Sequence, residues 1–559
     1  MPRRPPWFWL LLLAASALAV GGWLLFWYQC DDAYIAFRYI SNRRAGWGYV
    51  WNPPPFTPVE GYTSFLWIVL LDGLWSLTGL DPTVTATWVD LGFSLLRLGL
   101  VAEAVRRLPL PEAHEGLRPG LVGLSLLGCV TNTTWLAWTS SGLETSMYDA
   151  LLIGWVFWAV FGSRGAAWPV VGTLLVSLIT LTRPDGLLFL VATPVIVAAE
   201  RLRSGWRRTD ALALLPFALP VAHLLWRHAT YGFWLPNTYY AKHVRPWPEA
   251  GFTYLAVFLL EYTWWIWLVV LGVLGWRHRE DARRLEAWWA HAPTWLALGA
   301  LVAHAAYYVV RVGGDHFEYR IWLHWVEVAW VIWPWAVVRV AASRRAVLAL
   351  SATALVGTWW ITWPDWIQMR QVETKQRIPK LQLDVAPLFP PPLSWYASLH
   401  DLAERWLCRH TTRISHQSHR MFRLHHQKNF PEREASLSVA GPELWTEEAE
   451  LTRRYPVIAL GSVGIASWNM PYVAILDRMG LNDRVIARNP VPEDQFRWMA
   501  HDRRPPPGYI ACYRPNIRWG PGRFEVKPRT EPLSADDIRA CEEAWMKMAL
   551  DGTLPPGKG

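Results

Sequence analysis

The chain has 559 residues, of which 52% are hydrophobic, and its mean hydropathy is +0.11. It is too apolar for an ordinary soluble enzyme and too polar to lie in a membrane throughout, so a large helical membrane domain followed by one soluble domain fits the composition. The formal net charge of +9 would favour nucleic acid as the partner of a soluble protein. Here most arginines flank apolar runs, which is the positive-inside pattern of membrane proteins and argues against nucleic acid.

The first apolar run, Trp7–Tyr28, follows Arg3 and Arg4. It is long enough to span a membrane, and the bulky Trp27 and Tyr28 stand where a signal-peptide cleavage site needs small residues. We therefore expect an uncleaved membrane helix with its N-terminus in the cytoplasm. The residues that follow the run then lie outside.

Two adjacent carboxylates, Asp31 and Asp32, come directly after this run. A charge near hydrocarbon costs free energy unless water, a cation or a proton donor compensates it, so we interpret the pair as chemically active. The alternative is that a carboxylate caps the N-terminus of the following helix, which accounts for one aspartate better than for two.

The segment Tyr34–Tyr39 has the pattern of a short amphipathic helix that lies along the interface. Tyr34, Phe37 and Tyr39 are its expected anchors, and Arg38 is expected to be free to reach a phosphate. For Arg38, a role as a further interfacial anchor explains the sequence equally well.

The positions of the arginines decide which apolar segments cross the membrane. If all of them crossed, Arg106, Arg107 and Arg118 would lie outside. The segment 62–80 contains Asp72 and other polar residues, so we place it along the outer interface. The basic loops then become cytoplasmic, about eleven helices span, and the C-terminus lies outside. The later apolar segments are 82–107, 119–138, 143–162, 168–182, 184–200, 209–229, 251–276, 292–312, 317–341 and 346–363.

From about Trp366 the membrane pattern stops. We divide the chain into a membrane domain over residues 1–365, with outer juxtamembrane helices over 31–80, a linker over 366–450 and an extracytoplasmic α/β domain over 451–559. In the last part, Val457–Leu460 and Tyr509–Cys512 have the pattern of buried strands, and Glu447–Arg454, Pro471–Met479 and Ala535–Leu550 have that of helices.

Several features of the C-terminal part have ordinary explanations. The segment Gly461–Gly464 lacks the Walker lysine and the full dinucleotide fingerprint, so we expect a turn that ends a strand. The five histidines between residues 410 and 426 have no fixed ligand spacing, which favours a solvated basic linker over a metal site. At most one disulfide is expected, between Cys512 and Cys541. Either sugar stacking or core packing explains three aromatic residues, Trp468, Tyr472 and Trp498.

Seven motifs of the chain resemble those of the arabinofuranosyltransferase B-like family, which are integral-membrane glycosyltransferases of the C superfamily. In the C-terminal part, Ile475–Asp483 resembles the strand and the Gly-Leu-x-Asp turn of the same family's extracytoplasmic domain. The chain departs from the family at His316–Arg320, where relatives more often carry a tryptophan and small residues. The seven motifs are Asp31–Tyr39, Trp51–Pro53, Val59–Trp67, Gly142–Thr145, Thr182–Gly186, Pro236–Lys242 and Gly313–Asp315.

The resemblance implies that a sugar, D-arabinofuranose, moves from a polyprenyl-phosphate donor in the membrane to a glycan acceptor, outside a bacterial plasma membrane. Such a transfer needs a carboxylate to deprotonate the acceptor hydroxyl and cations to stabilise the departing phosphate. Asp31 and Asp32 are the candidate catalytic residues, and Asp31 is the expected base because the family's residue aligns there. The candidates for binding the phosphate are Lys242, His243, Arg183, Arg320 and Arg38.

The candidates for binding sugar or acceptor lie in the outward loops. Glu144 and Asp185 stand where helices begin, so helix capping explains each of them slightly better than sugar binding does. Asp315 follows two glycines, which let the backbone approach a ligand closely. The sequence assigns no cofactor, and a divalent cation held by these carboxylates is left open. The set is Glu60, Tyr62, Glu144, Asn237, Tyr240 and Asp315.

Two alternatives share some of these features. A transferase of the same superfamily that adds another sugar to a protein or a lipid would differ only in its substrates. A lipid or sugar transporter would also carry charged residues in its membrane domain, but transporters commonly consist of repeated halves. The sequence shows no internal repeat, and its polar motifs gather at one side.

Overall fold

The computed structural model describes residues 4–277, 279, 291–317, 319–369, 385–415, 455–520, 523–527 and 529–557. The chain packs as two compact units. Residues 29–86 and 221–245 pack with the C-terminal part, although the sequence suggested that they belong with the membrane helices. The predicted boundaries near residues 365 and 450 stay predictions. Unit 1 comprises Met1–Tyr28, Thr87–Pro220 and Pro246–Leu424, and unit 2 comprises Gln29–Ala86, Val221–Arg245 and His425–Gly559.

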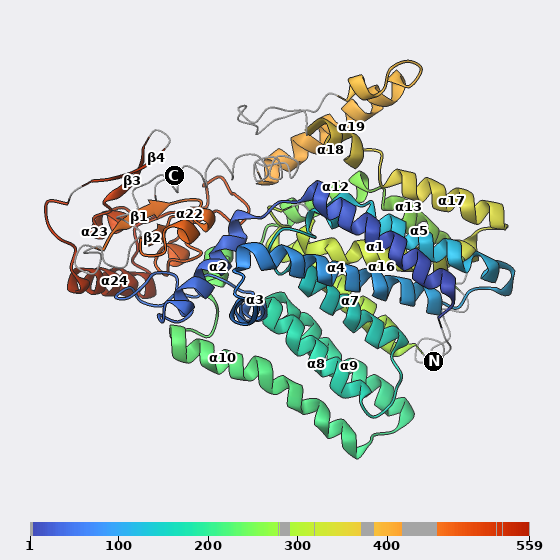
Figure 1. Ribbon diagram of the computed structural model, residues 1–559, viewed down its shortest axis with the longest axis horizontal. Helices are drawn as coiled ribbons and strands as arrows, with labels where there is room; N and C mark the ends of the chain where they lie inside the picture. The colour runs from blue at the N-terminus through green and yellow to red at the C-terminus, as the bar shows by residue number, and fades with distance from the viewer. Residues whose placement is uncertain are drawn as a thin grey trace. The chain divides into compact units, whose positions relative to one another are not determined.

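Unit 1 consists of α-helices and short 3₁₀ or π turns within its described residues. Its long helices lie beside one another as a bundle, drawn from blue through yellow in Figure 1. The helices are α1 Pro6–Phe26, α4 Pro82–Arg107, α5 Arg118–Val130, α6 Thr133–Ala137, α7 Thr145–Phe161, α8 Trp168–Thr182, α9 Leu187–Ser204, α12 Pro248–Glu261, α13 Trp265–Arg277, α15 Ala292–Tyr307, α16 Leu323–Val340, α17 Arg344–Gly357, α18 Thr362–Met369 and α19 Ser394–Ser415.

Six helical stretches among the described residues are long and apolar enough to cross a membrane. A seventh span results if α12 and α13 cross together as one broken helix, since their axes differ by 89°. The break contains Thr263, whose φ of 52° is incompatible with a continuous helix. The six stretches are Pro6–Phe26, Pro82–Arg107, Arg208–Tyr231, Ala292–Val312, Arg320–Val340 and Arg344–Ile367.

This number is lower than the eleven predicted spans because four apolar segments form shorter or more polar helices. The helices α5, α7 and α8 have 13, 17 and 15 residues. At 1.5 Å per residue, a helix of 15 residues reaches only about 22 Å, which is less than the thickness of the hydrocarbon core. The last turns of α9 carry Glu200, Arg201 and Arg203.

The helices α1 and α4 run antiparallel. Arg4, just before α1, lies 3.1 Å from Glu103 near the end of α4, measured from Nε to Oε2. The chain therefore makes no net crossing between the end of α1 and the start of α4. The segment 62–80 forms the 14-residue helix α3, Phe65–Thr78, in this interval. The prediction that this segment does not span agrees with this geometry.

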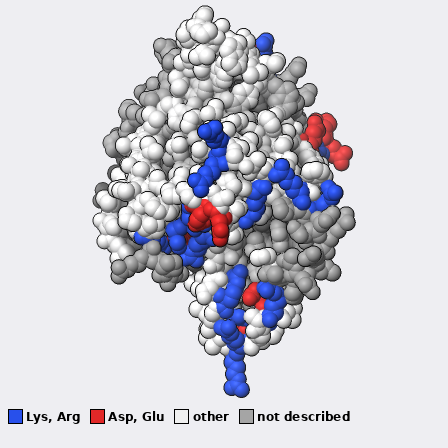
Figure 2. Space-filling model, turned by 90° about the vertical axis from the view of Figure 1, so that its right-hand side faces the viewer, with Lys and Arg blue, Asp and Glu red and all other residues white. Residues whose placement is uncertain are grey.

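Arginines gather at the end of unit 1 that holds Arg4. Arg106 and Arg107 lie in the last turn of α4, and Arg344 at the start of α17 donates to the Ala113 carbonyl at 2.9 Å. Figure 2 views the side of the molecule where these helix ends lie, and Lys and Arg clearly exceed Asp and Glu on the visible surface. One end of the bundle is therefore basic, as the positive-inside pattern predicts.

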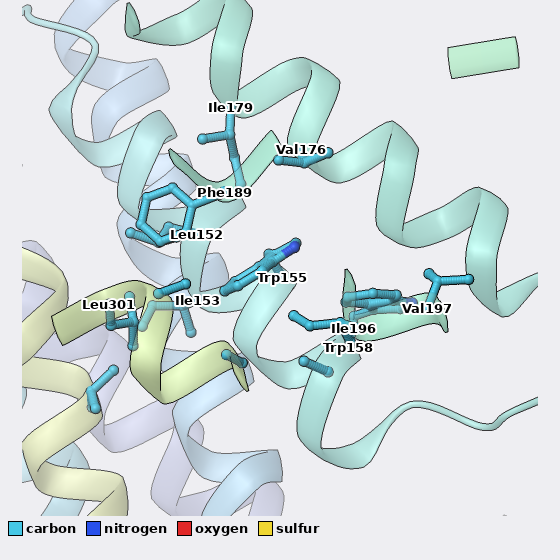
Figure 3. Packing of buried hydrophobic residues seen from close by; sticks show 14 of the residues in the cluster. Leu152, Ile153, Trp155, Trp158, Val176, Ile179, Phe189, Ile196, Val197 and Leu301 are labelled. Carbon is cyan, nitrogen blue, oxygen red and sulfur yellow. The ribbon is translucent and has the colours of Figure 1, made fainter. Parts of the chain in front are cut away.

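Tryptophans fill the core where α7, α8, α9 and α15 meet (Figure 3). Trp158 and Trp168 stack with ring centroids 4.5 Å apart, and each indole N–H donates to the other's backbone carbonyl. The indole of Trp155 donates to Thr193 Oγ1 at 2.9 Å. These bonds satisfy the polar atom that each buried indole carries into an apolar core.

Unit 2 joins the juxtamembrane segments to the C-terminal strands and helices. The strands β1 and β2 pair in parallel, with Val457 opposite Ala474, and β3 and β4 pair antiparallel. The elements are α2 Asp31–Arg44, α3, most of α10 Ala218–Tyr231, α11 Asn237–Lys242, β1 Val457–Leu460, α22 Gly464–Asn469, β2 Ala474–Asp477, α23 Tyr509–Cys512, β3 Ile517–Gly520, β4 Arg523–Val526 and α24 Ala535–Leu550.

The predictions for the C-terminal part are confirmed at some elements and wrong at others. The strand Val457–Leu460, the helix Ala535–Leu550 and the strand implied by the resemblance at 475–477 are present. The helix predicted over Pro471–Met479 is wrong, because its centre pairs with β1 as a strand. The strand predicted over Tyr509–Cys512 is wrong as well, because this segment forms α23. Short apolar runs have no periodicity that separates the two structures.

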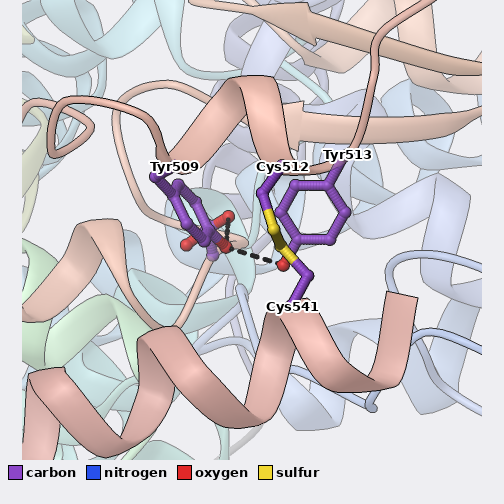
Figure 4. The surroundings of a disulfide bond; sticks show 5 residues. Tyr509, Cys512, Tyr513 and Cys541 are labelled. Atoms are coloured by element: carbon purple, nitrogen blue, oxygen red, sulfur yellow. Dashed lines mark hydrogen bonds between the residues drawn. A yellow bond between two sulfur atoms is a disulfide. The ribbon is translucent and has the colours of Figure 1, made fainter. Parts of the chain in front are cut away.

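The predicted disulfide between Cys512 and Cys541 is present and ties α23 to α24 (Figure 4). Beside it, Tyr509 donates to Asp483 Oδ2 at 2.8 Å, and its hydroxyl lies 3.2 Å from that of Tyr513. The predicted turn at Gly461–Gly464 follows β1. The helix predicted at Glu447–Arg454 and the histidines from 416 to 426 lie outside the described residues.

Candidate functional site

Asp31 and Asp32 occupy the first turn of α2, but their carboxylates differ in their contacts. Asp31 Oδ2 accepts from Ser462 Oγ at 2.9 Å and from the Gly464 N–H at 3.2 Å, and its Oδ1 accepts from the Ile465 N–H at 2.9 Å. It therefore caps α22, not its own helix. Burial raises the pKa of Asp31, although these hydrogen bonds oppose the change. Within the described part of the chain, the half-buried Asp32 carboxylate makes no hydrogen bond or ion pair.

The glycine at the start of α22 is required by this contact. A Cβ atom at Gly464 would lie 1.7 Å from the backbone oxygen of Asp31, which is far inside van der Waals contact. The turn that resembled a phosphate-binding loop is therefore shaped to receive the aspartate of α2.

Arg38 lies inside unit 2 and is 1% exposed. Its Nε donates to the Trp51 carbonyl at 2.6 Å, and Nη1 and Nη2 bind three carbonyls between residues 467 and 473 together with Asn52 Oδ1. These bonds use all five N–H donors of a guanidinium group. Burial lowers the pKa of Arg38 to about 9, so the group stays cationic at neutral pH. The predicted role in phosphate binding has no donor left for it.

The predicted interfacial anchors of α2 are core residues of unit 2. Tyr34, Phe37 and Tyr39 are buried, and the Tyr34 hydroxyl donates to Gln29 Oε1 at 2.7 Å. The expectation that they face the membrane is wrong, because the C-terminal part covers this helix: Phe37 packs edge to face against Trp468. The same contact accounts for Trp468 by packing.

Glu60 and Tyr62, candidates for sugar or acceptor binding, contact α10 instead. Glu60 is held by both Nε and Nη2 of Arg227, at 2.6 and 3.1 Å. Burial raises the pKa of Glu60 to about 7, and Arg227 opposes this change. The Tyr62 hydroxyl lies 3.0 Å from that of Tyr231. Both candidates therefore have structural partners.

Asn237 holds α11 against the turn that follows β2. Its amide Nδ2 donates to the carbonyls of Gly480, Leu481 and Asp483 at 2.8 to 3.1 Å. At the same turn, a Cβ atom on Gly61 would lie 1.8 Å from Asn482 Oδ1. Two of the seven motifs thus meet the Gly-Leu-x-Asp turn of the C-terminal part, and packing accounts for these residues.

The end of α11 carries the other predicted residues of unit 2. Lys242 is exposed at its last position, His243 follows it, and the Tyr240 ring lies 3.9 Å from the guanidinium carbon of Arg488. Arg503 donates to the carbonyls of Tyr240 and His243 at 2.9 and 3.1 Å. These arginines were not among the predicted site residues. The signal that could have indicated them is the density of arginines between residues 484 and 504.

In unit 1, Arg183 is balanced by carboxylates. Its Nη1 lies 3.2 Å from Glu144 Oε1 and its Nε 3.2 Å from Asp185 Oδ1. Asp185 Oδ2 also accepts from the Tyr308 hydroxyl at 2.7 Å and lies 3.0 Å from His304 Nε2. Glu144 makes no capping bond to α7, so it serves Arg183 and not its own helix. A neutralised guanidinium is a poor candidate for binding a further anion.

Arg320 and Asp315 also pair with each other. Arg320 Nε lies 3.2 Å from Asp315 Oδ2, and Asp315 Oδ1 accepts from the His316 N–H at 2.8 Å. Gly313 and Gly314 precede the pair with φ of 95° and 97°, which side chains rarely adopt. The glycines therefore form the turn that lets Asp315 face its own loop.

Sequence reasoning missed a second cluster of charges inside the bundle. Arg97 Nη1 lies 3.1 Å from Glu327 Oε1 and 3.7 Å from Asp149 Oδ2, and His324 Nδ1 lies 3.2 Å from Asp149 Oδ1. All four are fully buried or 1% exposed. Charged residues within apolar segments are the signal that could have found them. Among the described residues, no group of three or more His, Cys, Asp or Glu is arranged to hold a metal ion.

Comparison with known proteins adds to this geometry. No family model matches the chain. The chain is 24% identical over 507 residues to the terminal beta-(1->2)-arabinofuranosyltransferase of Corynebacterium glutamicum, a match that covers 84% of this chain and 72% of that protein. It is 28% identical over 346 residues to the protein of the same name from Mycobacterium tuberculosis, which covers 56% of this chain and 53% of that protein. The chain thus spans only about half the length of the mycobacterial relative.

Among solved structures, the chain is similar to ArnT from Cupriavidus metallidurans bound to undecaprenyl phosphate, with a TM-score of 0.51 over 83% of this chain and 85% of that chain. The apo state of ArnT gives a TM-score of 0.50. The sequence identity is 13% and 14%, so the likeness concerns the fold. The predicted helical fold, with several helices long and apolar enough to cross a membrane, is confirmed. The resemblance to arabinofuranosyltransferases is confirmed as well.

Proposed function

Because the chain is similar to two terminal arabinofuranosyltransferases and has the fold of ArnT, we propose that it is a membrane glycosyltransferase that moves D-arabinofuranose from a polyprenyl-phosphate donor to a glycan acceptor. The observation that carries this proposal is the similarity over 84% of the chain to the corynebacterial protein. The undecaprenyl phosphate bound to ArnT supports a lipid phosphate as the carrier of the sugar.

The reaction breaks the bond between the anomeric carbon and the phosphate oxygen and forms a bond from that carbon to an acceptor oxygen. A carboxylate takes the proton of the acceptor hydroxyl, and cations stabilise the phosphate as it leaves. Of the predicted cations, Arg38, Arg183 and Arg320 are held by other groups of the protein. We propose Lys242, which is exposed at the end of α11, and His243, which follows it, for the phosphate.

The contacts of the aspartate pair suggest separate roles. A general base must come within hydrogen-bond distance of the hydroxyl that it deprotonates. Both oxygens of Asp31 accept hydrogen bonds from the start of α22, whereas Asp32 has an unoccupied carboxylate within the described residues. We therefore assign the base to Asp32 and give Asp31, the residue expected from the sequence, a positioning role.

Sugar transfer by two isosteric variants tests these assignments. Asp32→Asn should lower transfer from polyprenyl-phosphate-arabinose by at least about a hundredfold, because general-base catalysis typically contributes that much. Its thermal unfolding midpoint should stay near that of the wild type. Asp31→Asn should lower the unfolding midpoint as well as transfer. Normal transfer by Asp32→Asn would refute its role, and transfer by neither the wild type nor any variant from several lipid-linked sugars would refute the function.

Sidedness and metal dependence belong to the same proposal. The basic end of unit 1 supports a cytoplasmic position for that end, with the catalytic residues and the C-terminal part outside a bacterial plasma membrane. Labelling of a cysteine introduced at Arg344 by an impermeant reagent in intact cells would contradict this orientation. Transfer in the presence of EDTA tests the divalent cation that the sequence left open.

A further inference from the structure

Four arginines of unit 2 are called the arginine cluster here: Arg484, Arg488, Arg503 and Arg504. Arg488 and Arg503 contact α11. Arg488 donates to the Arg484 carbonyl at 2.9 Å, and Arg504 donates to the Arg503 carbonyl at 2.8 Å. Burial is the main cause that lowers the pKa of Arg484 and of Arg503. Glu542 opposes this change at Arg484 and Asp502 opposes it at Arg503, and the positive charge of Arg488 lowers both pKa values further. The cluster therefore concentrates positive charge in a small volume.

No carboxylate of the described residues lies within ion-pair distance of the cluster, although Glu542 and Asp502 partly offset the charges of Arg484 and Arg503. Its side chains donate to backbone carbonyls, including those of Pro58 and Tyr231 for Arg484, and no ion pair with Asp or Glu is formed by any of the four within the described residues. The two acids that adjoin the cluster in the sequence have closer partners. Asp483 accepts from the N–H groups of residues 485 and 486, and Asp502 pairs with Arg497 at 3.0 Å.

Arg488 has the geometry of a binding group. Its guanidinium lies 4.4 Å from the Phe233 ring centroid and 3.9 Å from that of Tyr240, so two aromatic rings hold the plane. Nη1 donates to Asn237 Oδ1 at 3.2 Å. The Arg488 side chain also hydrogen bonds with Tyr240, and no carboxylate among the described residues pairs with it. The planar edge of a fixed guanidinium matches the oxygens of a phosphate.

Exposed aromatic and apolar side chains of unit 2 accompany these charges. Trp234, Leu235 and Tyr239, in and before α11, are 50%, 43% and 42% exposed. Arg504 lies over Trp498, which is 40% exposed. Arginine beside exposed tryptophan and tyrosine is typical of surfaces at the level of lipid headgroups. An inorganic anion alone would not require these apolar side chains.

We propose that the arginine cluster binds the phosphate of a lipid, with Arg488 as its central contact. This inference rests on the proposed function, in which the donor carries a lipid phosphate, and it adds residues from the C-terminal part of the chain to Lys242. Arg503 links the arginine cluster to Lys242, because it donates to the carbonyls on both sides of Lys242, those of Ala241 and His243.

Binding of lipids to the purified full-length chain tests the proposal without reference to catalysis. Native mass spectrometry in detergent would compare undecaprenyl phosphate, phosphatidylglycerol and inorganic phosphate. The variant Arg488→Gln and the double variant Arg488→Gln/Arg504→Gln should bind undecaprenyl phosphate at least about tenfold more weakly, because a charge-assisted hydrogen bond is lost. The matched control is Arg539→Gln, which removes an exposed arginine of the same unit that pairs with Asp536 at 2.5 Å.

The thermal unfolding midpoint shows whether each variant folds. Arg488→Lys keeps the positive charge but loses the planar guanidinium, so its affinity for undecaprenyl phosphate should be intermediate. If phosphatidylglycerol competes equally with undecaprenyl phosphate, the cluster binds membrane headgroups. If phosphatidylglycerol does not compete, the cluster binds the donor. Unchanged binding of both lipids by the folded double variant would overturn the proposal. If the variants lose lipid binding while the wild type transfers no sugar, the inference stands and the proposed function fails.

Discussion

Arginines are stabilised differently in the two units. In unit 1, Arg97 pairs with Glu327 at 3.1 Å and Arg183 pairs with Asp185 at 3.2 Å, so buried cations meet carboxylates. In unit 2, Arg38 and the arginine cluster donate mainly to backbone carbonyls. A carbonyl satisfies the N–H donors but leaves the net positive charge in place. The arginine cluster therefore keeps a positive charge that can attract an anion, whereas the charges of Arg97 and Arg183 are already balanced by carboxylates.

The surroundings of each unit explain the difference. In a membrane, an unbalanced charge costs several kcal/mol, so charged residues pair locally. Where water reaches the surface, solvent and counterions screen the same charge. Unit 2 does contain ion pairs, such as those of Arg227 with Glu60 and of Arg497 with Asp502. The four arginines of the arginine cluster form none within the described residues.

The largest effect is expected when the carbonyl-bound arginine at the centre of unit 2 is removed. Arg38→Met leaves five acceptors without donors, and at about 1 kcal/mol for each bond the loss of stability is on the order of 5 kcal/mol. Thermal unfolding and limited proteolysis of the full chain in detergent measure it. The matched variant Arg43→Met, which removes a half-exposed arginine of the same helix, should cost far less. Similar effects of the two variants would contradict the importance assigned to Arg38.

A somewhat smaller loss is expected when the carboxylate-paired arginine of unit 1 is removed. Arg97→Met leaves two buried carboxylates without their cation. It should lower the free energy of unfolding by about 3 to 5 kcal/mol, as measured by unfolding in detergent. The double variant Arg97→Met/Glu327→Gln removes one of the stranded charges and should recover part of the loss. Arg38 pairs with no acid among the described residues, so no equivalent rescue is expected for Arg38→Met. Failure of the double variant to recover stability would show that packing, and not charge, dominates at Arg97.

The sequence predicted what local patterns determine. Most of the helices that are long and apolar enough to span coincide with predicted apolar runs. The one disulfide expected, between Cys512 and Cys541 in the C-terminal part, is present. The position of segment 62–80 at the outer interface, inferred from Asp72, stays a prediction. Contacts across several hundred residues were not predictable in this way. Asp31 caps α22, whose first residue lies 433 positions later, and no periodicity in either segment records the pairing.

The candidate site illustrates the same limit. The motifs that carry the resemblance were interpreted as chemistry, yet packing accounts for Arg38, Gly61 and Asn237. A motif marks a position where few residue types fit, and a buried junction restricts residue type as strongly as catalysis does. Lys242 and Asp32, whose side chains are exposed or half-buried, are the predicted residues for which packing gives the weakest explanation.

A moderate dependence of stability on pH is expected from Asp483 in unit 2. Burial raises the pKa of Asp483 from 3.8 to about 7, so the folded state favours the protonated acid. Its stabilising effect is present below about pH 4 and is lost as pH rises through 7. Unfolding midpoints measured between these values should fall with pH in the wild type, and Asp483→Asn should flatten this part of the curve. An unchanged slope in the variant would assign the pH dependence to other groups.

The smallest effect on stability, and a selective one on function, is expected from Lys242→Ala. Lys242 is exposed at the end of α11, and an exposed side chain contributes little to packing, so the unfolding midpoint should change by no more than the measurement error. Turnover should fall, because the proposed phosphate loses a cation as it leaves. Transfer kinetics separate the two effects, with Arg539→Gln as the exposed control in the same unit. Wild-type kinetics in a well-folded Lys242→Ala protein would refute the role of Lys242 and leave His243 and the arginine cluster as the groups of unit 2 proposed for that phosphate.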